Sequence, residues 1–163
     1  MSSFVRTTFL LALAALILGG CQMSKGKSPW TRAQRAVFAS EGFTETDRGW
    51  EFSINDRLLF ATDESVVLPE QAGSIRRISG RLLAVDIRRA AVEGHADGSG
   101  GADHNQRLSE RRAAAVAEVL VASGFAQSAV STLGLGDRFP VESNSTVEGR
   151  RENRRVVILI AAP

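Results

Sequence analysis

The spacing of apolar and polar residues divides the chain into a short series of helices and strands. Apolar residues at helical spacing predict helices over residues 31–40, 69–84 and 104–123. Alternating or continuous apolar runs predict four strands, over residues 50–54, 90–94, 131–135 and 156–160, and residues 136–149 read as a polar loop. This order predicts an α+β domain with helices packed on a mixed four-stranded sheet.

The first twenty residues have the pattern of a secretory signal. Arg6 supplies a positive charge, and residues 9–18 form an unbroken apolar run that is too short to span a bilayer, which takes about 20 residues. Small residues then lead directly into Cys21, the only cysteine. This resembles the lipobox of bacterial lipoproteins, in which the cysteine is acylated and anchors the chain to a membrane. The alternative is an ordinary cleavage site before a free cysteine.

Gln22 follows this cysteine, where by analogy with other lipoproteins an aspartate would favour the inner membrane, so we expect the outer membrane. Residues 21–29 are mostly small and polar, and we expect them to be a lipidated tether. Residues 30–57 then hold the first helix and strand, and residues 58–163 hold the main domain.

The composition of the chain narrows the range of functions that it could have. The chain has 163 residues, 44% of them hydrophobic, which is enough for one domain with a real core. A formal net charge of +2 gives no support to nucleic-acid binding. A single cysteine excludes an internal disulfide framework and any metal site built from several cysteines.

Arg112 conflicts with the pattern of the longest predicted helix. At about 100° per residue, it falls about 40° from Leu108, in the middle of the apolar stripe. An arginine that faces the core needs an anion or several acceptors, because an unpaired buried charge costs several kcal/mol. The alternative is that the side chain extends past the sheet edge into water.

Asp97 favours an inward arginine, because it lies in a glycine-rich loop directly before the same helix. A carboxylate beside Arg112 would form a pocket with one charge of each sign, which suits a zwitterionic ligand. A plain ion pair between Asp97 and Arg112, which would bind nothing, stays open.

Catalysis, a metal and a cofactor find no support in the sequence. His95, Asp97, Asp103 and His104 have no spacing that places metal ligands on one helix face. Ser99 lies in a loop without the strand–turn–helix geometry of a nucleophile. We therefore expect a binding protein rather than an enzyme.

Several spaced motifs resemble the OmpA-like peptidoglycan-binding domain. They are Glu93-Gly94-His95-Ala96-Asp97, the run Asn105-Gln106-Arg107-Leu108-Ser109-Glu110-Arg111-Arg112-Ala113, Gly134-Leu135-Gly136, Pro140, Asn144, Gly149-Arg150 and Asn153-Arg154-Arg155-Val156. The match extends over about residues 58–160. It implies the OmpA-like fold and non-covalent binding of the diaminopimelate residue of peptidoglycan.

The resemblance also implies which residues contact that ligand. Asp97 and Arg112 would hold the zwitterion, Asn105 and Arg154 match further contact positions, and Leu108 matches a position that packs beside the ligand. Residues 60–63, which end at Asp63, correspond to the other pocket wall. Ala96 stands where the family usually has threonine, and Ala61 where it often has aspartate.

Further motifs resemble a subfamily of outer-membrane lipoproteins that act in signalling. They are Gly42-Phe43-Thr44-Glu45, the strand at Trp50, Leu59-Phe60-Ala61, Leu68-Pro69-Glu70, Leu133-Gly134-Leu135-Gly136 and the final Ala-Pro. This resemblance implies a second partner, a YfiR-like periplasmic repressor of a membrane diguanylate cyclase, with residues 30–57 as its contact surface. The alternatives are that this segment only completes the core, and that the protein is a purely structural tether between membrane and wall. A homodimer also stays open.

Overall fold

The computed structural model describes residues 28–60 and 64–162. The predicted signal peptide, the lipidation site Cys21 and most of the 21–29 tether lie outside the described residues. Asp63, at the predicted pocket wall, lies outside them as well, as does Ala61.

A mixed sheet of five strands forms the middle of the domain. Its strands are β1 (Thr44–Thr46), β2 (Gly49–Asn55), β3 (Ala90–His95), β4 (Val130–Gly134) and β5 (Arg155–Ala161), in the order β1-β2-β5-β3-β4. All neighbours are antiparallel except β3 and β4. The mixed sheet is confirmed, but the predicted count of four strands is wrong. The missed strand, β1, is Thr-Glu-Thr and has no apolar alternation to reveal it.

Three longer helices agree with the sequence prediction. They are α1 (Arg32–Glu41), α3 (Pro69–Ala84) and α4 (Ala102–Ala122). Thr31 caps α1, since its hydroxyl accepts from the backbone of Gln34 while the Gln34 side chain accepts from the backbone of Thr31. Gly42 ends the same helix at φ +83°, a left-handed conformation that glycine adopts without strain.

Short helices were not predicted, because a few residues cannot show a helical period. They are α2 (Asp56–Leu59), α5 (Val147–Asn153) and the 3₁₀ turn η1 (Gln127–Ala129). The predicted loop over residues 136–149 is therefore wrong at its end, where the hydroxyl of Thr146 accepts from the backbone of Gly149 and caps α5.

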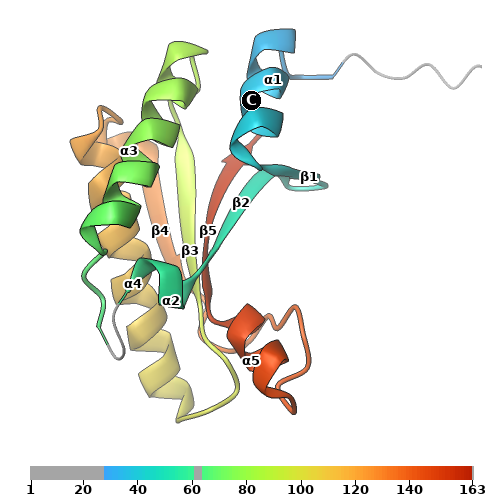
Figure 1. Ribbon diagram of the computed structural model, residues 1–163, viewed down its shortest axis with the longest axis vertical. Helices are drawn as coiled ribbons and strands as arrows, with labels where there is room; N and C mark the ends of the chain where they lie inside the picture. The colour runs from blue at the N-terminus through green and yellow to red at the C-terminus, as the bar shows by residue number, and fades with distance from the viewer. Residues whose placement is uncertain (1–27, 61–63, 163) are drawn as a thin grey trace, which may run out of the picture.

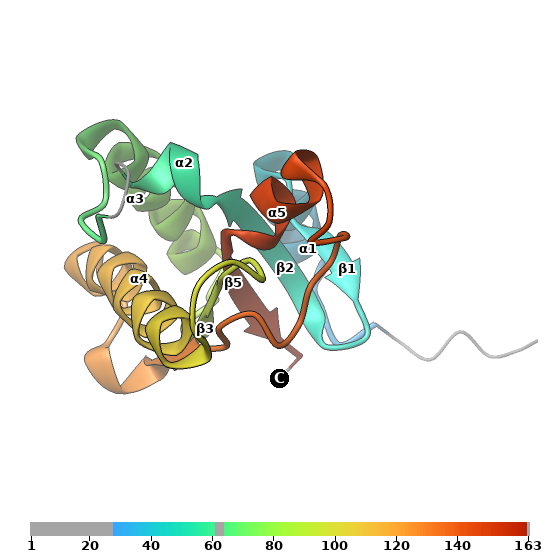
Figure 2. The ribbon, with the colours of Figure 1, turned by 90° about the horizontal axis from the view of Figure 1, so that it is seen from below.

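α1, α3 and α4 cover one face of the sheet (Figures 1 and 2). Phe38 of α1, Ile78 of α3 and Val116 of α4 belong to one core with Trp50 and Ile158 of the strands. In β5, all of residues 156–160 are buried, which confirms the prediction of a strand covered on both faces. None of the described helices is long and apolar enough to cross a membrane.

The domain has two ends along its long axis (Figure 1). α1 and the last described residues of the chain lie at one end, which we call the α1 end. α5, the start of α4 and the loop after β3 lie at the other, which we call the α5 end.

Candidate functional site

A cavity of about 710 Å³ opens at the α5 end of the domain. It is formed by α2, the loop after β3, the first half of α4 and the residue before β5. Its lining residues are Asp56, Arg57, Ala96, Asp97, Ser99, Gly100, His104, Asn105, Leu108, Arg112 and Arg154. The site residues expected from the sequence therefore come together here, apart from Asp63, which lies outside the described residues.

Arg112 faces inward and is 5% exposed, so the prediction from helical spacing is confirmed and extension into water is wrong. Three contacts hold its guanidinium group. Nη1 donates to Oδ2 of Asp56 at 2.9 Å, and Nε donates to the carbonyl of Glu64 at 3.3 Å. Its Cζ atom also lies 5.1 Å from the centre of the Phe60 ring, within the range of a cation–π contact.

Asp97 is also buried, but it pairs with a different arginine. Its Oδ1 accepts from the backbone of Ser99 at 2.8 Å and from the Ser99 hydroxyl, and its Oδ2 pairs with Nη1 of Arg154. Burial by itself would raise the pKa of Asp97. The Ser99 hydrogen bonds and Arg154 outweigh burial and lower that pKa, so the carboxylate is ionised at neutral pH.

The plain ion pair between Asp97 and Arg112, which the sequence left open as an alternative, does not occur between the described atoms. Asp56 stands between them in a chain of ion pairs: Oδ2 of Asp56 contacts Arg112 at 2.9 Å and Nε of Arg154 at 3.6 Å, and Arg154 in turn holds Asp97. We call Arg112, Asp56, Arg154 and Asp97 the ion chain. It brings both arginines and both carboxylates into one cavity.

Asn105 holds the glycine-rich loop in place. Its Nδ2 donates to the carbonyls of Asp97 at 3.1 Å and Ser99 at 3.0 Å, which fixes the loop against α4. Ala96, which is 7% exposed, donates its backbone N–H to the carbonyl of Gly136 at 2.8 Å. Leu108 is half-buried and supplies apolar surface to the cavity.

Sequence reasoning missed Asp56 and Arg57 as site residues, and it considered Ser99 and His104 only as catalytic or metal groups. Asp56 is 56 positions from Arg112, and nothing in the local pattern connects the two. The available signal was position, because Asp56 follows closely on a predicted strand, and chain turns at strand ends often carry functional groups.

His95 lies beside the site but on the opposite face of the sheet from α4. Its ring is buried, and neither nitrogen has a hydrogen-bond partner among the described residues. Burial, together with the positive charges of Arg155 and Arg48, lowers the pKa of His95 to about 3.

Within residues 28–60 and 64–162, no group of three or more His, Cys, Asp or Glu side chains could hold a metal ion.

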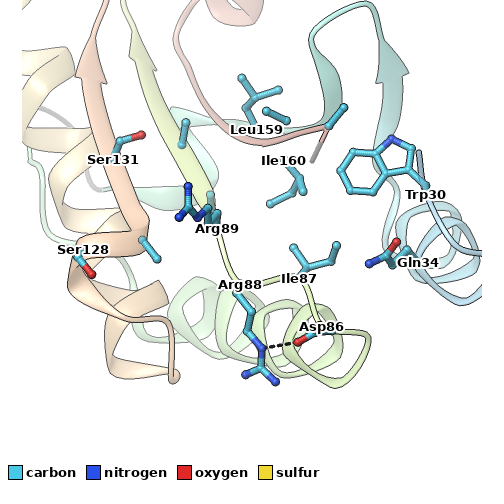
Figure 3. A pocket seen from close by; sticks show the side chains of 15 residues that line it. Trp30, Gln34, Asp86, Ile87, Arg88, Arg89, Ser128, Ser131, Leu159 and Ile160 are labelled. Carbon is cyan, nitrogen blue, oxygen red and sulfur yellow. Dashed lines mark hydrogen bonds and ion pairs between the residues drawn. The ribbon is translucent and has the colours of Figure 1, made fainter. Parts of the chain in front are cut away.

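A second cavity, of about 660 Å³, lies at the α1 end (Figure 3). Trp30, Ile87 and Ile160 supply much of its apolar surface, and Arg88 and Arg89 bring positive charge to it. Arg88 is already paired with Asp86 at 2.9 Å. Among the described residues that line this cavity no ion pair is buried, so its chemistry differs from that of the α5 end.

Comparisons with known proteins extend the resemblance seen in the sequence. The pattern that defines the OmpA family matches residues 59–154. The outer-membrane lipoprotein YfiB of Pseudomonas aeruginosa is 40% identical over 154 residues, covering 93% of this chain and 92% of that protein. The putative lipoprotein YfiB of Escherichia coli K12 is 38% identical over 154 residues, covering 94% of this chain and 95% of that protein.

The fold is also found among solved structures. The cell wall anchor of the type VI secretion system from Pseudomonas aeruginosa superposes with a TM-score of 0.66 at 29% identity, covering 81% of this chain and 96% of that one.

Proposed function

The chain belongs to the OmpA family, and from that premise we propose that it is an outer-membrane lipoprotein that binds peptidoglycan without covalent chemistry. The names of its relatives support this proposal, since they include outer-membrane lipoproteins and a cell wall anchor. We assign the site to the cavity at the α5 end.

The ion chain is the observation that indicates which class of ligand the site binds. A ligand that offers both a carboxylate and an ammonium group can exchange contacts with arginines and carboxylates held within one cavity. Diaminopimelate, in the stem peptide of peptidoglycan, carries these two groups on one carbon. Arg112 would take its carboxylate, Asp97 its ammonium group, and Leu108 would pack against its aliphatic chain.

The placement of the site at the end opposite the first described residues supports an anchoring role. The first described residues lie at the α1 end, and the site lies at the α5 end (Figure 1). α4 extends between the two regions, and its 21 residues span about 31 Å at 1.5 Å per residue. If Cys21 is acylated, the α1 end is held near the membrane and the site points away from it, toward the wall.

A sacculus pull-down tests the binding site. Arg112→Gln removes the guanidinium group that would hold the ligand carboxylate, and charged hydrogen bonds are worth about 1.5–3 kcal/mol, so we expect at least roughly tenfold weaker binding to purified sacculi. Arg111→Gln is the matched control, because Arg111 is the exposed neighbour on the same helix and does not line the cavity. Equal binding by both variants, with the fold verified by unfolding, would remove Arg112 from the site.

Membrane fractionation tests the anchor separately. Cys21→Ser should move the protein from the outer-membrane fraction to the soluble periplasm, because it removes the thiol that would carry the lipid. A variant that stays in the membrane fraction would contradict lipidation at Cys21.

We also propose a signalling role in addition to peptidoglycan binding. The similarity to the YfiB relatives covers 93–94% of this chain, whereas the family pattern begins only at residue 59. Residues 30–57 are therefore included in the similarity, and we propose that their exposed side chains contact a YfiR-like repressor. Trp30, Phe38 and Trp50 of this segment are buried in the core, so a partner would contact their polar neighbours.

Co-purification tests this role against that of a purely structural tether. The tagged full-length protein should retain a small periplasmic partner, and its overproduction should raise cyclic-di-GMP. Sacculus binding with no partner and no change in cyclic-di-GMP would favour the tether.

A further inference from the structure

We propose that Asp56 is a positioning and specificity-determining residue of the site, an inference that rests on the proposed function. Asp56 lies outside residues 59–154, where the family pattern matches, and it follows directly after β2. It is 5% exposed and lines the site cavity. A buried carboxylate needs compensation, and the structure shows two arginines that supply it.

One oxygen of Asp56 organises both arginines. Its Oδ2 lies 2.9 Å from Nη1 of Arg112 and 3.6 Å from Nε of Arg154, and its backbone N–H donates to the carbonyl of Arg154 at 3.0 Å. Two guanidinium groups that converge on one point repel each other unless an anion lies between them. Asp56 therefore sets the distance and orientation of the two cations.

Among the described residues, only part of the Arg112 fork has a partner. Nη1 and Nε are used by Asp56 and the Glu64 carbonyl, while Nη2 makes no hydrogen bond to the described residues. With the Phe60 ring beneath it, the guanidinium group is held before a ligand arrives. A group held in this way loses little conformational entropy when it binds a carboxylate.

Asp56 also sets the charge of the cavity. Three arginines and two aspartates line it, so it carries a small positive excess. Without Asp56 that excess doubles, which favours a plain dianion over a ligand whose carboxylates are balanced by ammonium groups. We therefore infer that Asp56 makes the site prefer diaminopimelate to pimelate, which has the same chain and carboxylates but no amino groups.

Titration of the full mature protein with diaminopimelate and with pimelate, followed by NMR chemical shifts, tests this inference. For Asp56→Asn we expect diaminopimelate to bind roughly tenfold more weakly and the preference over pimelate to fall by a similar factor. Asp56→Glu keeps the charge but displaces the guanidinium groups, so it should weaken diaminopimelate binding and keep the preference.

Asp86→Asn is the control, because it makes the same change of charge at an exposed position that lines the cavity of the α1 end and not the site, where salt screens a distant charge. It should match the wild type with both ligands. If the wild type binds neither diaminopimelate nor sacculi, the proposed function fails. If the wild type binds and both Asp56 variants retain its affinity and preference, the function stands and the role of Asp56 is overturned.

Discussion

At the α1 end of the molecule, aromatic side chains pack in a buried cluster, whereas at the α5 end three buried charges and the half-buried Arg154 neutralise one another. Phe38 lies at the centre of the cluster, stacked on Trp50 with ring centres 4.8 Å apart and edge-on to Trp30 at 5.1 Å. At the α5 end, the ion chain lies around the site in place of an aromatic cluster. Apolar packing is insensitive to pH and modest salt, while ion pairs depend on the protonation and position of each partner.

The difference indicates how stability and binding are divided. Apolar burial at the α1 end stabilises the fold without needing exact charge placement. The charges at the α5 end contribute less to stability, because the cost of removing ions from water offsets much of their attraction. In exchange, they place donors and acceptors in a cavity where a charged ligand can use them.

The largest expected effect comes from removing the centre of the aromatic cluster. Phe38 is fully buried, and Phe38→Ala should lower the free energy of unfolding by about 3–5 kcal/mol, through lost burial and a cavity. Denaturant unfolding measures this change. Binding of diaminopimelate by the fraction that stays folded should match the wild type. A loss below about 1 kcal/mol would show that the cluster is not the main support of this end.

A glycine of β3 that faces α4 tests how closely the α5 end is packed. A Cβ added at Gly94 would lie 2.0 Å from the backbone carbonyl oxygen of Ser109, so Gly94→Ala must push α4 away from the sheet. We expect a loss of about 1–3 kcal/mol or more in unfolding free energy, together with weaker sacculus binding, because α4 carries Arg112.

Gly80→Ala is the matched substitution, since Gly80 lies in α3 with no atom within 4 Å of its added Cβ. Here we expect a gain of about 0.8–1 kcal/mol from higher helix propensity and unchanged binding. Equal effects at the two glycines would contradict the close approach of α4 to β3.

The response to acid is expected to come from the α5 end. His95 has a pKa of about 3 when folded and about 6.5 when unfolded, so between these values the unfolded chain binds more protons and stability falls as the pH falls. At about 1.4 kcal/mol per unit, this gives a loss of about 2 kcal/mol between pH 6.5 and pH 5. The lowered pKa of Asp97 acts in the same direction, below the pKa of an unfolded aspartate.

Unfolding at pH 7 and pH 5 measures the contribution of His95. His95→Gln should flatten the dependence, while His104→Gln, at an exposed position, should leave it unchanged. A wild-type protein with the same stability at both pH values would show that His95 takes up a proton without cost in the fold.

Much of the fold was predictable because its long elements carry strong periodic patterns. α3 was predicted to the residue, and α1, α4 and the four longer strands were predicted to within about two residues. β1, α2 and α5 were not, since three to seven residues hold too little pattern, and their form depends on neighbours such as the Thr146 cap.

For the site, the sequence predicted the unusual residue but not its partner. A charged residue within an apolar stripe is recognisable from the sequence, so the inward direction of Arg112 could be predicted from helix geometry. Its carboxylate partner could not. Asp56 reaches Arg112 only because β2 pairs with β5, at Asn55 and Arg155, and β5 pairs with β3, against which α4 packs.

The sequence by itself therefore determined the main elements, the family resemblance and the presence of a buried arginine, because each depends on local spacing or on a motif. Only the tertiary structure decided which carboxylate meets which arginine. That choice depends on strand pairing between residues far apart in the chain, and no local pattern records it.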